Sequence, residues 1–378
     1  MSTIGILGGG QLARMLAIAG APLGQRFLIV DAAEDACAGQ VAPLITADWH
    51  DAAVLDAFAR RIDVATFDFE NVPADVAHRL TDHTRVFPNP DALAVAQDRL
   101  AEKTLFREIG LDTPHYRAVD DRVDLERALR EVGTPAVLKT RRLGYDGKGQ
   151  FLLHGAADID TAWAALGGAP SILESFVRFQ REVSVIAVRS RDGEFRHYPL
   201  TRNWHSNGVL SISLPLVTGA DELEREAVAH SRRLAETLDY VGTFALELFV
   251  HGDRLLGNEM APRVHNSAHW TIEGATCSQF ENHVRAVAGL PLGDTSPRGY
   301  SVMLNWIGDL PDARGALAEA GTHWHDYGKR SRAGRKVGHA TVCACDARTL
   351  AGRLERVATR LDRMQQAEPA LAALAQME

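Results

Sequence analysis

Cysteine is scarce in this 378-residue chain, and the few that are present form no familiar binding pattern. The four residues are Cys37, Cys277, Cys343 and Cys345, and no two of them make a CxxC pair. This spacing argues against a structural zinc site and against a disulfide framework. We therefore expect reduced, buried thiols, which suit the cytoplasm.

Long apolar runs and an excess of positive charge are also missing. No run reaches the roughly 20 residues that a membrane-spanning helix needs, and residues 1–7 are too short and uncharged to act as a signal peptide. The formal net charge of −8 argues against nucleic acid as the main partner. We therefore expect a cytoplasmic protein with neither a membrane nor a nucleic-acid partner.

What is present predicts an α/β protein of two or three domains, because 378 residues exceed the usual size of one domain. Apolar segments at residues 4–7, 27–30 and 64–69 alternate with helical patterns, which is typical of a parallel sheet. Ligands of such sheets bind at the carboxyl ends of the strands. Residues 8–11, Asp31 and Glu70 follow these segments, so we expect a site there.

The glycine run at residues 8–10 has two interpretations. Together with Gln11, Leu12 and Ala13 it fits the GxGxxA pattern, and Asp31 ends the next strand. This combination is typical of dinucleotide binding and makes an NAD(P) oxidoreductase one hypothesis. The same geometry holds any phosphate at a helix N-terminus, because free amides and the helix dipole favour an anion there.

A second glycine-rich segment, residues 139–150, predicts a phosphate flap. Lys139 ends an apolar strand, and Gly144, Gly147 and Gly149 follow within eleven residues. Glycine lets backbone amides approach a ligand closely, and successive amides with lysine charge can cradle phosphate oxygens. The segment is not a Walker loop, because it has no GxxxxGK[ST] pattern. A basic hairpin with a glycine turn is the alternative interpretation.

Two glutamates on an expected hairpin form a candidate metal site. If the chain turns over residues 252–254, Glu247 faces Glu259; with a shorter turn the two are one step out of register. Facing like charges destabilise a sheet, and a divalent cation would remove that cost. Mg²⁺ is commonly held by one or two carboxylates plus substrate phosphates, and Asn258 adds an oxygen. The alternative is a solvated hairpin face.

The order of these motifs resembles the ATP-grasp superfamily, and within it the family of 5-(carboxyamino)imidazole ribonucleotide synthases of purine biosynthesis. The resemblance covers nearly the whole chain, and it includes the stretches GGGQLARM, FENV, QDR, GYDGKGQ, ESFV, NEMAPRVHNSAHW, SQFE and GRKVGH. Four positions depart from the usual family pattern, namely Val264, Ala268, Arg330 and Ala333. None of them removes a charged group on which the interpretation depends.

The resemblance implies an ATP-grasp fold, α/β with α+β character overall, in three parts. These are a Rossmann-like pre-ATP-grasp domain at residues 1–112, a small lid domain at 113–181, and a C-terminal domain at 182–378 that carries the metal and substrate sites. We expect one long helix over residues 90–109, ended by Gly110, just before the first boundary.

The resemblance also implies the reaction. Bicarbonate attacks the γ-phosphate of ATP to give carboxyphosphate, and the exocyclic amine of 5-aminoimidazole ribonucleotide then takes the carboxyl group. ADP and phosphate are released. The implied cofactors are ATP and Mg²⁺, and the implied assembly is a homodimer. An ATP-grasp carboxylase or formate-dependent transformylase with another acceptor, and a nucleotide-binding protein without catalysis, are the further alternatives.

The resemblance assigns residues to each ligand. The ATP site would contain Arg99, Lys139, Gly144, Tyr145, Asp146, Gly147, Lys148, Gly149, Gln150, Glu174, Ser175, Phe176, Val177, Glu182, His205, Asn258 and Glu259, with Glu247 and Glu259 binding the metal. The ribonucleotide and bicarbonate would be held by Gly10, Gln11, Leu12, Glu70, Tyr145, Asp146, Arg263, His265, Asn266, Ser267, Lys329, Arg332 and Arg335. The catalytic residues implied are Arg263, His265, Asp146, Glu70 and Lys329.

Overall fold

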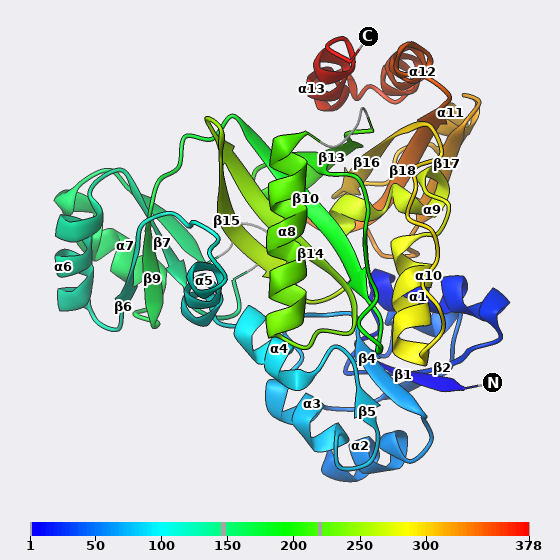
Figure 1. Ribbon diagram of the computed structural model, residues 1–378, viewed down its shortest axis with the longest axis horizontal. Helices are drawn as coiled ribbons and strands as arrows, with labels where there is room; N and C mark the ends of the chain where they lie inside the picture. Colours follow the sequence, from blue (N-terminus) through cyan, green and yellow to red (C-terminus); the bar gives the residue numbers. More distant parts are fainter. Residues whose placement is uncertain (1, 145–148, 218–220, 378) are drawn as a thin grey trace.

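The computed structural model describes residues 2–144, 149–217 and 221–377. Its strands form three sheets that follow one another along the chain (Figure 1). The predicted residues Tyr145, Asp146, Gly147 and Lys148 lie outside the described ranges. In the parts of the chain that are described, no helix combines the length and apolar character that a bilayer crossing needs.

The first sheet is parallel and lies among helices, as the apolar segments predict. Its strands are ordered β3-β2-β1-β4-β5, which is a doubly wound arrangement. The strand bounds are β1 Thr3–Leu7, β2 Arg26–Asp31, β3 Leu44–Thr46, β4 Val64–Phe67 and β5 Arg85–Val86, and the helices are α1 Gln11–Gly20, α2 Ala52–Ala59 and α3 Ala74–Leu80. Because β1 lies between β2 and β4, the residues that follow these three strands meet at one edge of the sheet.

The single helix expected at residues 90–109 is wrong. The chain instead forms α4 Pro90–Ala96 and α5 Arg99–Glu108, separated by two residues. Asp98 caps α5 by accepting hydrogen bonds from the amides of Leu100 at 3.0 Å and Ala101 at 3.4 Å. The Gln97 side chain donates to the carbonyl oxygens of Glu70 and Val72 at 2.8 and 2.6 Å. Both side chains therefore hydrogen-bond to backbone amides or carbonyl oxygens, and an uninterrupted helix would not make these bonds.

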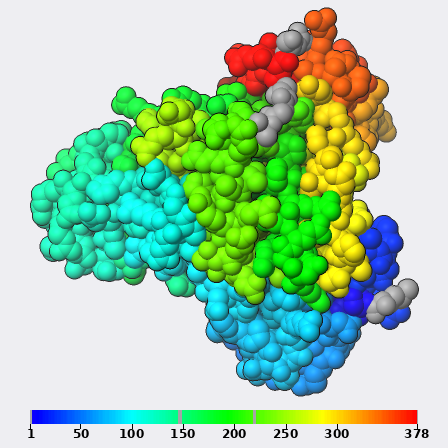
Figure 2. All heavy atoms as spheres, in the orientation of Figure 1, coloured from blue at the N-terminus to red at the C-terminus, as the bar shows by residue number. Residues whose placement is uncertain are grey.

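The second sheet is small and antiparallel, with the strand order β6-β9-β7-β8. It consists of β6 Tyr116–Val119, β7 Ala136–Thr140, β8 Gln150–Leu153 and β9 Ser171–Ser175, packed against α6 Arg122–Val132 and α7 Ile159–Ala165. Lys139 pairs with Gln150 across β7 and β8, so these two strands form the base of the flap. Figure 2 shows this unit, cyan to teal, projecting from the body of the molecule.

The third sheet is a single nine-stranded antiparallel sheet from residue 181 to residue 344. Its order is β15-β14-β10-β12-β13-β16-β18-β17, and β11 pairs with β10. The strands are β10 Arg181–Arg189, β11 Phe195–His197, β12 Thr201–Ser206, β13 Val209–Pro215, β14 Gly242–His251, β15 Arg254–Ala261, β16 Tyr300–Ile307, β17 Thr322–Asp326 and β18 Lys336–Ala344. The domain boundaries at residues 112 and 181 remain predictions.

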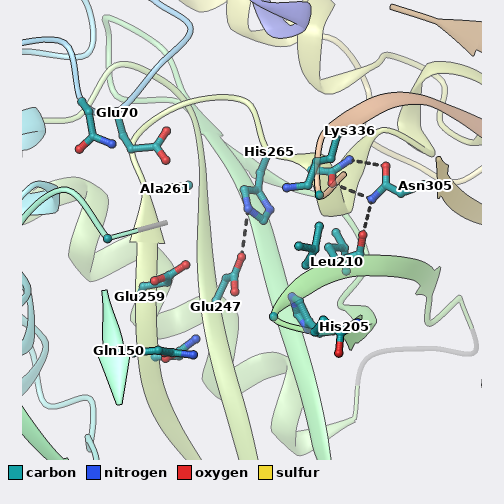
Figure 3. Close-up of a pocket in the computed structure, with 18 of the residues that line it drawn as sticks. Glu70, Gln150, His205, Leu210, Glu247, Glu259, Ala261, His265, Asn305 and Lys336 are labelled. Atoms are coloured by element: carbon teal, nitrogen blue, oxygen red, sulfur yellow. Dashed lines mark hydrogen bonds and ion pairs between the residues drawn. The ribbon is translucent and has the colours of Figure 1, made fainter. Parts of the chain in front are cut away.

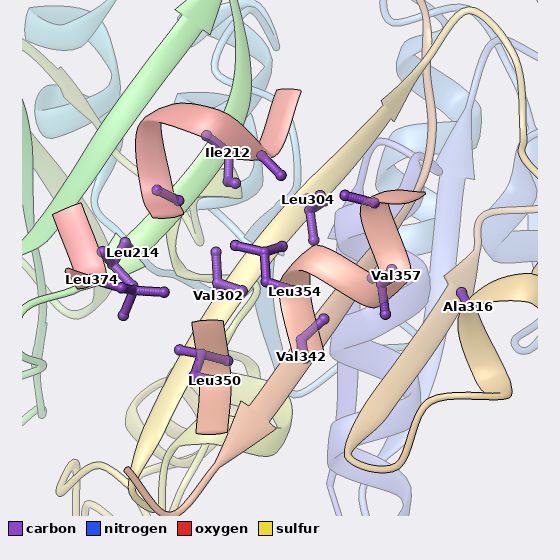
Figure 4. Close-up of a cluster of buried hydrophobic side chains, with 14 of the residues drawn as sticks. Ile212, Leu214, Val302, Leu304, Ala316, Val342, Leu350, Leu354, Val357 and Leu374 are labelled. Atoms are coloured by element: carbon purple, nitrogen blue, oxygen red, sulfur yellow. The ribbon is translucent and has the colours of Figure 1, made fainter. Parts of the chain in front are cut away.

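Helices cover this large sheet and close its core. They are α8 Glu222–Thr237, α9 Thr271–Gly274, α10 Gln279–Ala288, α11 Ala313–Leu317, α12 Ala347–Arg360 and α13 Met364–Leu374. In the largest apolar cluster, Leu350, Leu354 and Val357 of α12 pack with Val302 of β16 and Val342 of β18 (Figure 4). Helix α12 is thereby packed against β16 and β18, and these two strands also carry residues of the site.

The cysteines follow the sequence expectation only in part. All four carry free thiols, and Cys37 and Cys277 are buried. Cys343 is half-buried and Cys345 is exposed, because β18 ends at Ala344 and Cys345 lies beyond its protected face.

Replacing Leu354 should test how much this cluster contributes to stability. Leu354 is fully buried, so Leu354→Ala should lower the free energy of unfolding by about 2–5 kcal/mol through lost burial and a residual cavity. Denaturant unfolding would measure the change. Leu317→Ala is the matched control, because Leu317 is 54% exposed and its loss should change stability by at most about 0.5 kcal/mol. Equal losses in the two variants would contradict this account of the core.

Candidate active site

A single cavity of about 1550 Å³ is lined by residues from all three sheets. Its walls come from the carboxyl edge of the parallel sheet, from strands β7, β8 and β9 of the small sheet, and from β10, β12, β14 and β15 of the large sheet. Strands β13 and β16, the start of α5, the loop before β18 and the segment after β15 also contribute to the lining. Figure 3 shows that Glu247, Glu259, His205 and Gln150 lie around one part of this cavity, while Glu70 and Lys336 lie further along it.

The two glutamates of the hairpin do face each other. The feature that brings them opposite is a β-bulge, which the sequence pattern did not predict. The turn between β14 and β15 is the shorter one, and His251 pairs with Arg254. That register alone would leave Glu247 one step away from Glu259. A β-bulge at Asn258 restores the pair, because Leu248 is opposite Gly257 whereas Glu247 is opposite Glu259. Bulges of this kind re-aim side chains next to active sites.

Each of these acids meets a nitrogen-bearing side chain from a different part of the chain. Glu259 lies 3.1 Å from Nη1 of Arg99 at the start of α5, and Glu247 lies 3.0 Å from Nε2 of His265. Burial alone would raise the pKa of Glu247, but the neighbouring His265 and His205 bring it well below its usual range. Glu247 is therefore ionised near neutral pH and suited to bind a cation.

A buried ion cluster joins the small sheet to α5. The Glu174 carboxylate lies 2.9 Å from Lys139 Nζ and 3.6 Å from Lys103 Nζ. Although burial would raise it, the charges of Lys103 and Lys139 lower the pKa of Glu174 to about 2. Lys103 is fully buried and also donates to the carbonyl oxygens of Gly257 and Asn258 at 2.9 and 2.7 Å. The bulge of β15 is thus held in place from behind.

A second ionisable pair lies near Glu247 and Glu259. His205 of β12 is 2.6 Å from the Glu182 carboxylate of β10. Burial lowers the pKa of His205, but the hydrogen bond and charge of Glu182 outweigh that effect and raise it overall. The two residues that the family resemblance places near ATP are therefore brought together here.

At the other end of the cavity, carboxylates already occupy part of the glycine turn. Asp31 accepts from the amides of Gly9 at 2.6 Å and Ala33 at 2.7 Å. Asp68 accepts from the amide of Ala13 at 3.2 Å, and burial raises its pKa to about 6. Asp31 therefore has both carboxylate oxygens engaged, and a dinucleotide pyrophosphate would approach Asp68. This geometry argues against the NAD(P) hypothesis.

A cationic wall faces the free part of the same turn. Lys329 Nζ donates to the side-chain oxygen of Gln11, which brings the loop before β18 to the N-terminus of α1. Arg332 and Arg335 line the cavity beside them. These groups can bind a phosphate through charge and hydrogen bonds, whereas the carboxylates of Asp31 and Asp68 limit how far it can enter.

Between the two ends, Arg263 pairs with Glu70. The Arg263 guanidinium donates through Nε to the Glu70 carboxylate and through Nη1 to the carbonyl oxygen of Val264. Burial would raise the pKa of Glu70, but the charge of Arg263 lowers it to about 2. Glu70 is therefore a weak base in this arrangement, and it suits orientation better than proton removal.

Most residues assigned from the resemblance line this cavity. They are Gly10, Gln11, Leu12, Glu70, Arg99, Lys139, Gly144, Gln150, Glu174, Ser175, Phe176, Val177, Glu182, His205, Glu247, Asn258, Glu259, Arg263, His265, Asn266, Lys329, Arg332 and Arg335. Their roles toward individual ligands remain predictions.

Two assigned residues are placed elsewhere. Ser267 is fully buried and is not among the residues that line the cavity; its hydroxyl lies 2.8 Å from Ser184 Oγ and 2.9 Å from His265 Nδ1, and its role toward a ligand remains a prediction. Gly149 is absent from the described lining. It has a φ of 71°, and a Cβ there would lie 2.6 Å from Thr140 Oγ1. The backbone therefore favours glycine at this position.

Sequence reasoning missed several residues of the site. Lys103 looks like a solvated helix residue, and Asp68 lies among apolar residues at the end of β4. Lys336 belongs to the GRKVGH stretch, from which no role for it is predicted, yet it lines the cavity. Asn305 interrupts the apolar run 302–307 of β16, and that signal could have identified it.

Three family descriptions match successive parts of the chain. Residues 1–97 match "Ribonucleotide synthetase preATP-grasp domain", residues 104–280 match "ATP-grasp domain", and residues 301–353 match "Phosphoribosylaminoimidazole carboxylase C-terminal domain". The first two agree with the predicted ATP-grasp fold and its N-terminal unit. The third description covers residues 301–353 separately. The predicted domain at residues 182–378 did not separate this part from the residues before it.

Curated proteins and solved structures are similar over almost the whole length. The N5-carboxyaminoimidazole ribonucleotide synthase of Pseudomonas aeruginosa is 50% identical, with 94% of this chain and 98% of that protein covered. The crystal structure of the synthetase from Thermus thermophilus is 52% identical, with a TM-score of 0.90 over 95% of this chain and 98% of that one. The Aspergillus clavatus synthase in complex with ADP and 5-aminoimidazole ribonucleotide is 28% identical, with a TM-score of 0.89 over 96% and 99%. The chain therefore belongs to the N5-carboxyaminoimidazole ribonucleotide synthase family of ATP-grasp ligases.

Proposed function

We propose that this protein carboxylates 5-aminoimidazole ribonucleotide with ATP and bicarbonate and releases ADP and phosphate. The observation that carries the proposal is the single cavity, in which an acidic pair and the cationic wall lie at opposite ends and Arg263 and His265 lie between them. The names of the relatives support this activity, and so does the Aspergillus clavatus complex with ADP and 5-aminoimidazole ribonucleotide.

The ATP end is built around Lys139 and Arg99. Lys139 is anchored by Glu174 and binds phosphate oxygens at the base of the flap, while residues 174–177 present backbone groups to the adenine edge. Glu182 accepts from the ribose hydroxyls, and His205 lies beside it. Phosphoryl transfer requires chiefly positioning and charge neutralisation, which this cationic environment supplies.

The acidic pair suits Mg²⁺. Glu247 and Glu259 face each other across the hairpin, and Asn258 lines the same cavity, so the side-chain donors that these residues offer a cation are oxygen atoms. Within the described residues no group of three or more His, Cys, Asp or Glu side chains could hold a metal, and two carboxylates plus substrate phosphates are the usual Mg²⁺ arrangement. The bound ion would neutralise charge that develops on the phosphates.

The middle of the cavity suits the carboxyl transfer. The guanidinium of Arg263 matches a planar anion such as bicarbonate or the carboxyl group of carboxyphosphate. Glu70 orients the amine of the ribonucleotide, whose phosphate lies against Lys329 and Arg335. The amine nitrogen forms a bond to the carboxyl carbon, the bond from that carbon to the phosphate oxygen breaks, and phosphate leaves with the electron pair as the amine loses a proton.

We also propose a cytoplasmic homodimer, as the family resemblance implies. Free thiols are compatible with a reducing compartment. Sedimentation of the purified protein would test the assembly, and a monomer at every concentration would contradict it.

Release of ADP should depend on both co-substrates. With ATP and Mg²⁺ present, we expect turnover only when bicarbonate and 5-aminoimidazole ribonucleotide are added together. A coupled ADP assay measures this, and mass spectrometry identifies the carboxylated product. ADP release that ignores the ribonucleotide would refute the proposed acceptor, and activity with formate in place of bicarbonate would indicate a transformylase.

Neutralising Glu259 should abolish most of the activity. Glu259→Gln keeps the size of the side chain but removes a charged metal ligand. Turnover should therefore fall by about 100-fold or more, since even residues that only support metal ligands can cost 10–100-fold. The measurement is the rate of ADP release as a function of Mg²⁺ concentration. Glu126→Gln is the control, because Glu126 pairs with Arg122 on the surface of α6. A near-normal rate in Glu259→Gln would contradict the metal role.

Removing Lys329 should weaken the ribonucleotide selectively. Lys329→Ala deletes one charge-assisted hydrogen bond to its phosphate, so the KM for the ribonucleotide should rise by about 10–100-fold while the KM for ATP changes little. Initial rates with each substrate varied in turn would measure both constants. Arg330→Ala is the matched control from the same loop, since Arg330 is exposed and is not among the residues that line the cavity. A rise in the KM for ATP alone would contradict this assignment, because it would show that the loop binds ATP and not the ribonucleotide.

A further inference from the structure

Two helices of the cavity wall are joined by a very short junction. Helix α4 ends at Ala96 and α5 begins at Arg99, and Figure 1 shows both helices between the first sheet and the small sheet. Gln97 and Asp98 connect them, and Gln97 and Arg99 both line the cavity. Because the junction is so short, the groups that its two ends bind are fixed relative to each other.

Gln97 holds the backbone of the loop that carries Glu70. Its Nε2 donates to the carbonyl oxygen of Glu70 at 2.8 Å and to that of Val72 at 2.6 Å. Carbonyl oxygens only accept, so the group that faces them must be the amide nitrogen with its two hydrogens. The carboxylate of Glu70 is held separately by Nε of Arg263. Two different elements therefore fix Glu70, one at its backbone and one at the end of its side chain.

The other end of the junction binds the groups of the ATP end. Arg99 lies 3.1 Å from the Glu259 carboxylate through Nη1, and its backbone amide donates to the carbonyl oxygen of Arg141 at 3.0 Å. Arg141 directly follows β7, the first strand of the flap. Asp98, which caps α5, also lies 3.4 Å from Nε of Arg142. The junction is thereby attached to the acidic hairpin and to the base of the flap.

Helix α5 makes this second attachment firm. Lys103 donates to two carbonyl oxygens of β15, and Glu102 accepts from the amide of Met260 at 2.6 Å. Both side chains are almost completely buried, so the helix cannot shift along β15 without leaving buried polar groups unpaired, which is costly. Gln97 extends this fixed position to the backbone of residues 70–72.

We propose that Gln97 is a positioning residue that keeps the amine of the ribonucleotide in register with carboxyphosphate. The inference rests on the proposed function, in which Glu70 orients the amine and Arg99 belongs to the ATP end. The carboxyl group has to pass from the phosphate to the amine, and these two residues are attached to opposite sides of that path. Gln97 joins them through its two hydrogen bonds and the short stretch of backbone that leads to Arg99.

The fate of carboxyphosphate depends on this register. When the amine is in place, its nitrogen attacks the carboxyl carbon. When the amine is displaced, water attacks the same carbon, and the bond from that carbon to the phosphate oxygen breaks with its electron pair. One water proton stays on the regenerated bicarbonate and the other passes to the departing phosphate. ATP is then hydrolysed without a carboxylated product, and a displacement of about 1 Å is enough to slow the productive attack by about 100-fold.

Removing the amide of Gln97 should uncouple ADP release from carboxylation. Gln97→Met keeps the length of the side chain but donates no hydrogen bond. At saturating ribonucleotide, product formation should slow by about tenfold for the two lost bonds. ADP release should slow less, so the ratio of ADP to carboxylated product should rise at least about twofold over wild type, while the KM for ATP changes by less than about twofold. A coupled ADP assay and mass spectrometry of the product give this ratio.

Asn89, at the other end of α4, provides the matched control. Its Nδ2 donates to the carbonyl oxygens of Leu238 and Asp239 at 2.7 and 3.2 Å, and it is not among the residues that line the cavity. Gln97→Glu and Asn89→Asp each replace an amide by a carboxylate of the same size, and each lose two such bonds. Both should lower the stability measured in denaturant, whereas only Gln97→Glu should raise the ratio of ADP to product.

The ratio, and not the rate alone, decides the proposal. A wild-type ratio in folded Gln97→Met and Gln97→Glu would overturn it, even if both variants were slow. A ratio raised equally in Asn89→Asp would also overturn it, because uncoupling would then follow from any loosening of α4. Failure of the proposed function is distinguishable, since the wild-type protein itself would then form no carboxylated product.

Discussion

The structure depends on two carboxylates that oppose each other across one hairpin. Like charges on facing strands are unfavourable, and the bulge at Asn258 creates this opposition where a regular register would have avoided it. Side chains from other parts of the chain offset this repulsion. Arg99 reaches Glu259 from the helix that links the first two sheets, and His265 reaches Glu247 from the segment after β15. Parts of the chain that are distant in sequence therefore converge on this pair, and the cavity forms between them.

The same logic explains why α5 is so polar on its buried side. Glu102 accepts from the amide of Met260 at 2.6 Å, and Lys103 donates to two carbonyl oxygens of β15. Burial raises the pKa of Glu102 and lowers that of Lys103, so each charge is costly unless both partners remain in place. Breaking one member of a buried pair costs far more than an exposed one. The helix is consequently fixed against the bulge, while Lys103 also holds Glu174 of the small sheet.

The sequence predicted the parts of this arrangement that depend on local pattern. The parallel sheet, the flap strands, the hairpin and the acidic pair all follow from alternation, glycine placement and spacing. The break between α4 and α5 could not be predicted, because Gln97 and Asp98 are compatible with a helix until the backbone of residues 70–72 comes within reach. The burial of Ser267 could not be predicted for a related reason. A serine beside a reactive histidine fits ligand binding equally well in sequence, and only the packing against Ser184 shows which side it faces.

The glycine turn after β1 shows why a short motif cannot decide a function. The GxGxxA spacing and the acid that ends β2 are both present, and both match a dinucleotide site. In the fold, however, both carboxylate oxygens of Asp31 accept hydrogen bonds, from the amides of Gly9 and Ala33. The Asp68 carboxylate accepts from the amide of Ala13. Half-buried Asp31 and buried Asp68 lie against the turn and repel a pyrophosphate that would need these same amides. A single phosphate held from outside by Lys329 and Gln11 avoids that conflict. The neighbouring strand end, which the motif does not include, therefore determines which anion the turn accepts.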